Sequence, residues 1–115
     1  MLNNSLKNKI VLITGASSGI GEEASKIFAL AGAHVILVAR SMDKLSQITS
    51  YIKAKGGIAY PVSLDVSDYK EVIEKTAIIK KEIGIPDIII NNAGSGIWKS
   101  TEDTDWKDIS AYMAV

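Results

Sequence analysis

Residues 14–21 read Thr-Gly-Ala-Ser-Ser-Gly-Ile-Gly and lie between an apolar run at residues 10–13 and a helical pattern that begins near Ile20. Glycine adopts backbone angles that other residues avoid, and it lets the main chain approach a ligand closely. The start of the following helix supplies free N–H groups and the positive end of the helix dipole. A strand, a glycine-rich turn and a helix in this order predict a loop that holds the pyrophosphate of a dinucleotide.

The spacing of the glycines distinguishes this turn from two related phosphate-binding loops. Gly15, Gly19 and Gly21 follow a TGxxxGxG pattern, whereas lactate-type dehydrogenases carry GxGxxG and phosphate-loop NTPases carry GxxxxGK[ST]. No lysine follows these glycines, so hydrolysis of a nucleoside triphosphate is disfavoured. Glycine and serine also form ordinary turns, and it is the position between a strand and a helix that favours the functional interpretation.

Composition restricts the class of protein and of partner. A length of 115 residues suits one domain, which we expect to span residues 1–115. Hydrophobic residues make up 47% and charged residues 23%, values typical of a globular chain. Thirteen basic and thirteen acidic residues give a net charge of zero, which indicates no general affinity for nucleic acid or for an acidic membrane surface. The expected partners are therefore small molecules.

Other classes of site are disfavoured by what the sequence lacks. It has no cysteine, which excludes disulfides, thiolate zinc sites and a cysteine nucleophile and suits a reducing compartment. The polar residues 1–9 contain no apolar stretch of signal-peptide length, and no apolar run approaches the ~20 residues that span a bilayer. His34, the single histidine, has no second imidazole or acidic cluster beside it. We expect a cytoplasmic protein without membrane contact or metal.

Four apolar runs predict strands. Residues 10–13, 35–38 and 88–90 are continuous and rich in β-branched side chains, which is typical of interior parallel strands covered on both faces. Residues 58–64 are less apolar and include Pro61, which cannot donate to a ladder. We therefore place this last strand at the margin of the sheet.

Segments whose apolar residues have helical spacing lie between these strands. Apolar residues recur at this spacing in a first segment, at Ile20, Ala24, Ile27, Phe28 and Ala31, and in a second, at Leu45, Ile48 and Ile52. Gly32 and Gly56 end these helices. A third helix is expected after Ser67 as N-cap, ending at Gly84 before Pro86, and a fourth from Thr104. The alternation predicts a Rossmann-like, doubly wound parallel α/β sheet of order 3-2-1-4, with ligands at the carboxyl ends of its strands.

Three motifs in this order resemble the N-terminal half of a short-chain dehydrogenase/reductase. They are the turn at residues 14–21, Leu64-Asp65-Val66 after the third strand, and Asn91-Asn92-Ala93-Gly94 after the fourth. Each has a simpler interpretation, since an aspartate after a strand often caps a turn and Asn-Asn-Ala-Gly forms acceptable turns. A methyltransferase-like or other nucleotide-binding Rossmann domain is the alternative assignment.

The resemblance implies a set of cofactor-binding residues. The pyrophosphate and its riboses would be lined by Gly15, Ser17, Ser18, Gly19, Ile20 and Gly21. Asp65 and Val66 would flank the adenine, where a carboxylate can accept the exocyclic amino proton. The backbone of Asn92, Ala93 and Gly94 would pass beneath the cofactor, and Asn91 would stabilise the sheet.

The end of the second strand predicts the choice of cofactor. Members of the family that prefer NAD carry an acidic residue there, which bonds the ribose hydroxyls and repels a 2′-phosphate. This chain reads Ala39-Arg40-Ser41 instead. The guanidinium of Arg40 matches phosphate geometry and Ser41 adds a hydroxyl, although Arg40 is also an ordinary surface residue at a helix start. The sequence therefore predicts NADP over NAD.

The resemblance further implies hydride transfer between nicotinamide and a carbonyl or alcohol substrate. The family's catalytic serine, its tyrosine and the lysine four positions after the tyrosine belong to a later strand and helix, so we expect no catalytic residue within residues 1–115 and no activity of this piece alone. We also expect the complete parent to be a homo-oligomer. A non-catalytic dinucleotide-binding module and a truncated gene product are the alternatives.

Overall fold

The computed structural model describes residues 4–17 and 19–92, and the expected helix from Thr104 lies outside them. Strands and helices alternate along the described chain as β1 (Ile10–Thr14), α1 (Gly19–Leu30), β2 (His34–Ala39), α2 (Met42–Ala54), β3 (Ile58–Ser63), α3 (Tyr69–Glu82) and β4 (Ile88–Asn91). None of the described helices is long and apolar enough to cross a bilayer.

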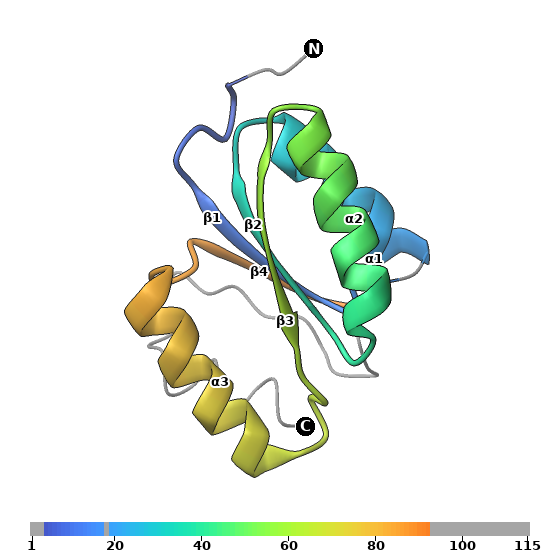
Figure 1. Ribbon diagram of the computed structural model, residues 1–115. Helices are drawn as coiled ribbons and strands as arrows, with labels where there is room; N and C mark the ends of the chain where they lie inside the picture. The colour runs from blue at the N-terminus through green and yellow to red at the C-terminus, as the bar shows by residue number, and fades with distance from the viewer. Residues whose placement is uncertain (1–3, 18, 93–115) are drawn as a thin grey trace.

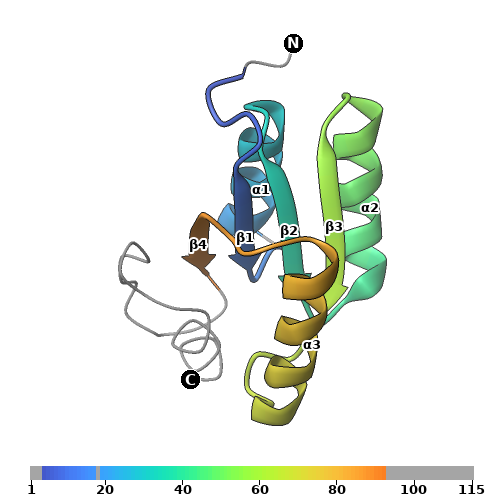
Figure 2. The ribbon, with the colours of Figure 1, turned by 90° about the vertical axis from the view of Figure 1, so that its left-hand side faces the viewer.

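The strands form one parallel sheet in the order β3-β2-β1-β4, as Figure 2 shows. In the register of the sheet, Val11 pairs with Val35 of β2 on one side and with Ile88 of β4 on the other. This arrangement confirms the predicted Rossmann-like fold and its order 3-2-1-4. It also brings the carboxyl ends of all four strands to one edge of the molecule.

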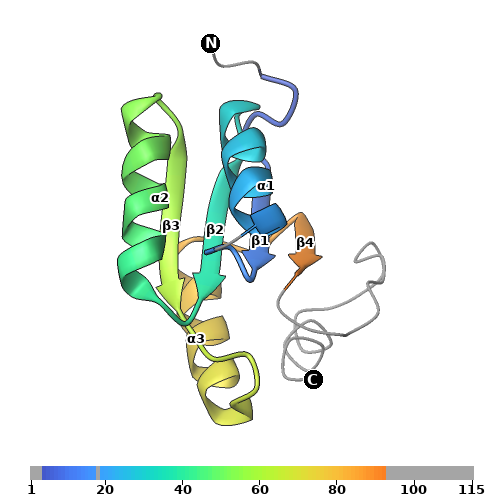
Figure 3. The ribbon, with the colours of Figure 1, turned by 90° about the vertical axis from the view of Figure 1, so that its right-hand side faces the viewer.

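Helices cover both faces of the sheet, with α1 and α2 on one face and α3 on the other (Figures 1 and 3). Side chains alternate along each strand. In β1, Val11 and Ile13 join the core beneath α1 and α2, whereas Leu12 joins the core beneath α3. Because every central strand is buried on both faces, the sequence shows continuous apolar runs rather than alternation.

The strand with the proline lies where the sequence predicts it. β3 pairs with β2 and, in the part of the chain that the structure describes, with no other strand. Pro61 lies opposite Leu37 in this marginal strand, where a missing N–H donor is tolerated. The other margin of the described sheet is β4, which pairs with β1.

Of the apolar residues that predict α1, Ala24 and Phe28 pack against the core and Ala31 is buried, whereas Ile20 and Ile27 are exposed. The side chains of Ile20 and Ile27 are 78% and 63% exposed, whereas Gly21, Ser25 and Ala29 are buried. Small side chains on the inner face bring the helix close to the sheet, and the hydroxyl of Ser25 donates to the carbonyl of Gly21 at 2.7 Å. The close approach of the helix to the sheet therefore places its small residues innermost.

The N-cap of α3 differs from the prediction. Its N-cap is Asp68, whose side chain accepts from the backbone N–H of Glu71 at 3.2 Å, and not Ser67. Ser67 instead donates to Asp65. The helix ends at Glu82 with Ile83 as C-cap, before Gly84, which has a positive φ of 132°. The predicted C-terminal ends of α1, α2 and α3 are confirmed, because Gly32, Gly56 and Gly84 follow these helices with a positive φ.

Candidate functional site

The carboxyl ends of the strands bring the three sequence motifs together. β1 ends at Thr14 beside Val38 of β2 and Asn91 of β4, and β3 ends at Ser63 beside Ala39. Sheet pairing therefore places the glycine turn, Arg40 and the Asn91-Asn92 pair at one edge. In parallel α/β sheets this edge is where ligands bind.

The turn after β1 has a backbone that only glycine suits at two positions. Gly15 and Gly19 have φ of 64° and 54°, in the left-handed region. Apart from its chain neighbours and the backbone of its own helix, no described atom lies within 4 Å of the point where a Cβ on Gly19 would be, so this position faces open space. Such a position, at the first residue of α1, leaves room for a ligand against the N–H groups of the helix start.

Gly21 is required for a different reason. A Cβ at this position would lie 2.1 Å from the carbonyl oxygen of Gly15 and 2.9 Å from the side-chain nitrogen of Asn92. The first turn of α1 therefore presses against the glycine turn and the end of β4. This close packing fixes the direction in which the helix start points.

A hydrogen-bond network joins the glycine turn to the residues after β4. The hydroxyl of Thr14 donates to the side-chain oxygen of Asn91 at 2.9 Å and accepts from the backbone N–H of Asn92 at 2.9 Å. The side-chain amide of Asn92 donates to the carbonyl oxygen of Gly15 at 3.3 Å. These bonds hold the first two residues of the Asn-Asn-Ala-Gly motif against the turn.

Arg40 follows β2 directly and is exposed. It is the only arginine of the sequence. Its carbonyl oxygen accepts from the hydroxyl of Ser63 at 3.0 Å, which holds its backbone beside the end of β3. Ser41 is the N-cap of α2, and its side chain accepts from the backbone N–H of Lys44 at 3.5 Å. A guanidinium in this place is available to an anion at the strand ends.

Asp65, which the sequence predicts to flank the adenine, also takes part in a turn. One oxygen of its carboxylate accepts from the hydroxyl of Ser67 at 2.7 Å and from the Ser67 backbone N–H at 3.0 Å. These bonds, with a smaller contribution from the positive charge of Arg40, lower the pKa of Asp65 below its ordinary value of 3.8. A carboxylate has about four acceptor positions, so one that caps a turn still accepts further bonds. Val66 is half-buried and packs against the core beneath α3.

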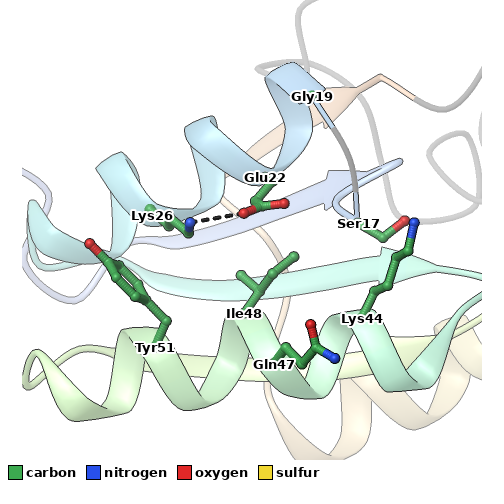
Figure 4. Close-up of a pocket in the computed structure, with 8 residues that line it drawn as sticks. All are labelled: Ser17, Gly19, Glu22, Lys26, Lys44, Gln47, Ile48 and Tyr51. Atoms are coloured by element: carbon green, nitrogen blue, oxygen red, sulfur yellow. Dashed lines mark hydrogen bonds and ion pairs between the residues drawn. The ribbon is translucent and has the colours of Figure 1, made fainter.

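A cleft of about 500 Å³ extends from the glycine turn between α1 and α2 (Figure 4). Ser17 and Gly19 line its end at the turn, and Lys44 and Gln47 line it from α2. Lys26 lies deeper and forms an ion pair with Glu22 at 2.8 Å. Lys44 is not among the site residues predicted from the sequence, although its position in the first turn of a helix, beside the motif at residues 39–41, is a visible signal.

Tyr51 and Lys55 have the spacing that the resemblance gives to a catalytic tyrosine and lysine, but they lie elsewhere. Both belong to the end of α2, and Tyr51 is about 14 Å along the helix from Met42 at the strand ends. The ammonium groups of Lys26 and Lys55 lie 4.5 Å and 5.6 Å from the centre of the Tyr51 ring. These are cation–π contacts on a helix surface.

Most of the predicted site residues lie at this edge of the sheet. Those with a described position are Gly15, Ser17, Gly19, Ile20, Gly21, Arg40, Ser41, Asp65, Val66 and Asn92, and those outside the described residues are Ser18, Ala93 and Gly94. The exposed side chain of Ile20 lies at the helix start, where a ligand can contact it. Within residues 4–17 and 19–92, no cluster of His, Cys, Asp or Glu has the arrangement of a metal site. The arrangement suits binding of a phosphate-bearing molecule.

Comparison with known proteins identifies the family. The model of the family described as short chain dehydrogenase matches residues 9–115. An uncharacterized oxidoreductase of Mycobacterium tuberculosis is 42% identical over 104 residues, which cover 88% of this chain and 30% of the relative.

Two solved structures are similar in fold. L-sorbose reductase from Gluconobacter frateurii, complexed with NADPH and L-sorbose, has a TM-score of 0.76 and 32% identity, over 98% of this chain and 47% of that one. A candidate D-mannonate oxidoreductase from Haemophilus influenza, with bound NAD, has a TM-score of 0.74 and 27% identity, over 84% of this chain and 34% of that one. The chain thus spans about a third to a half of the length of these proteins.

Proposed function

This chain belongs to the short-chain dehydrogenase family, and we propose that it carries the cofactor-binding half of an NADP-dependent oxidoreductase that acts on a carbonyl or alcohol substrate. Hydride transfer is the chemistry that a nicotinamide cofactor supplies when bound. The residues described above would bind and orient it. We further propose that residues 1–115 are part of one domain, which the rest of the family fold completes.

The backbone of the glycine turn supports cofactor binding. The open space at Gly19 and the contact of Gly21 with the carbonyl of Gly15 leave a cradle in front of the helix start. A pyrophosphate there would accept from the N–H groups of the first turn of α1 and lie at the positive end of its dipole. Ser17 would add a hydroxyl donor, and the Asn92 backbone would lie beside the cofactor.

The preference for NADP rests on one observation, the guanidinium of Arg40 at the end of β2 where NAD enzymes of the family would carry a carboxylate. Asp65 lies close enough to Arg40 for the guanidinium to lower its pKa, but its carboxylate is held by Ser67 after β3. The similarity to L-sorbose reductase, solved with NADPH, supports this choice, and the similarity to a structure with NAD shows that the fold accepts both cofactors.

Calorimetric titration of the full-length protein with NADPH and with NADH tests the proposal. We expect NADPH to bind at least about tenfold more tightly, because the 2′-phosphate adds a charge-assisted hydrogen bond. Equal affinity for the two cofactors would contradict the NADP preference, and no binding of either would contradict the function. Oxidation of NADPH by the same protein with a panel of carbonyl compounds distinguishes an enzyme from a non-catalytic binding module.

A further inference from the structure

The cleft between α1 and α2 is lined by Lys44 at its end near the glycine turn, four residues after Arg40 in the sequence. We propose that Lys44 binds the 2′-phosphate of NADP together with Arg40 and so contributes to the choice of cofactor. This inference rests on the proposed function, because it assigns a further residue to the same site. Lys44 would act as a cofactor-binding residue, with no part in the chemical step.

The backbone places Lys44 beside the turn. The N–H of Ala16 donates to the carbonyl of Val38 at 3.1 Å, so Ser17 lies just past β1 where β2 continues toward Arg40. Helix α2 begins at Met42, which puts Lys44 in its first turn. Ser17 and Lys44 line the same end of the cleft, and Figure 4 shows the Lys44 side chain extending toward Ser17.

The charges in the cleft leave Lys44 available for a ligand. Lys26, the other lysine that lines it, is engaged by Glu22 at 2.8 Å and stacks over Tyr51. Lys44 forms no ion pair with any residue that the structure describes. An anion that entered the cleft from the strand ends would therefore meet Lys44 as an uncompensated positive charge.

Local helix stability gives no reason for a lysine at this position. The N-terminus of a helix is the positive end of its dipole, where acidic residues stabilise and basic ones destabilise. Asp43 in the same turn follows this rule and Lys44 opposes it. A doubly charged phosphate at the helix start would reverse the balance, because it would attract both the helix N-terminus and the ammonium group.

The capping bond of Ser41 is compatible with this role. Its hydroxyl oxygen accepts from the backbone N–H of Lys44, which fixes the turn that carries the lysine. The hydroxyl proton remains able to donate to a phosphate oxygen. Arg40 would then supply a planar fork of donors and Lys44 a compact charge that approaches the phosphate from the helix side.

The test compares the variant Lys44→Gln with the control Lys53→Gln in the full-length protein. Lys53 is exposed in the last turn of the same helix, so both variants lose one positive charge from α2. Dissociation constants for NADPH, NADH and 2′,5′-ADP are measured by calorimetry, and thermal unfolding checks that both variants are folded. We expect Lys44→Gln to weaken NADPH and 2′,5′-ADP by about tenfold and NADH by less than about twofold, with Lys53→Gln unchanged.

Several results would overturn the inference. If the wild-type protein prefers NADPH and Lys44→Gln binds it as tightly, Lys44 has no role and the proposed function stands. If Lys44→Gln weakens NADPH and NADH equally, the lysine acts on the pyrophosphate or the turn. If the wild-type protein shows no preference for NADPH, both proposals fail. Recovery of NADPH affinity in Lys44→Arg would support the role of the charge.

Discussion

The hydroxyl of Thr14 lies 2.9 Å from the backbone nitrogen of Asn92 and accepts its hydrogen bond. Thr14 ends β1 and is fully buried, whereas Asn92 follows β4 and is 78 residues further along the chain. The same hydroxyl donates to the side-chain oxygen of Asn91. One small polar group therefore links two neighbouring strands where the candidate site begins.

Replacing Thr14 by valine keeps the shape of the side chain and removes the hydroxyl that makes these hydrogen bonds. We expect Thr14→Val to lower the free energy of unfolding by about 1–3 kcal/mol, because buried partners are left without a hydrogen bond. Urea unfolding measures this loss. Thr76→Val is the control, since the buried Thr76 hydroxyl on α3 has no hydrogen-bond partner among the described residues and its removal should be neutral or stabilising. Equal stability of Thr14→Val and the wild type would show that these hydrogen bonds do not stabilise the fold.

Replacement by alanine should affect stability differently at the two glycines at the start of α1. Gly21→Ala places a Cβ 2.1 Å from the Gly15 carbonyl oxygen, and we expect a loss of roughly 3 kcal/mol of stability together with loss of NADPH binding. Gly19→Ala meets no described atom but must adopt a positive φ, at a cost of about 1–2 kcal/mol. Denaturant unfolding and calorimetry compare the two. A Gly21→Ala protein that is the more stable of the pair would refute the close packing of α1.

The variant Arg40→Ala should separate the two cofactors. We expect NADPH binding to weaken by about 1.5–3 kcal/mol, the usual contribution of a charged hydrogen bond, because the guanidinium is removed from the end of β2. NADH binding should be nearly unchanged, since it carries no 2′-phosphate. Calorimetry provides both constants, and Arg40→Lys is the matched variant that keeps the charge and loses the planar fork. An equal loss of affinity for NADPH and NADH would argue against recognition of the 2′-phosphate by Arg40.

The low pKa of Asp65 depends chiefly on Ser67. We expect Ser67→Ala to raise the pKa of Asp65 toward its ordinary value of 3.8, because the hydroxyl bond is the largest cause of the shift. Carboxyl titration followed by NMR measures this change. A group with a depressed folded-state pKa stabilises the fold above its unfolded-state pKa, and that stabilisation is lost as the pH falls below about 3.8 toward the folded value. Asp65→Asn should thus differ from the wild type least in acid, and a difference independent of pH would contradict this linkage.

The sequence predicts the sheet well, because continuous runs of β-branched residues favour strands over other secondary structure. Residues 10–13 and 35–38 fall inside β1 and β2, and Pro61 correctly marks a margin of the sheet. The apolar spacing predicts that α1 forms, but it does not show that Gly21 and Ser25 lie on the inner face, where only small side chains let the helix approach the sheet. The link from Thr14 to Asn92 depends on pairing between strands far apart in the sequence, which local patterns do not encode.

The margin of the sheet at β4 should make a polypeptide limited to residues 1–115 associate with itself. In the described chain β4 pairs only with β1, and such an apolar margin with unpaired backbone groups attracts further strands. The exposed side chains of Ile20 and Ile27 add an apolar patch on α1. Analytical ultracentrifugation should therefore detect oligomers, and Ile27→Glu should reduce them more than Ile73→Glu on α3, the helix that covers the opposite face. A monomer at all concentrations would contradict the expected association.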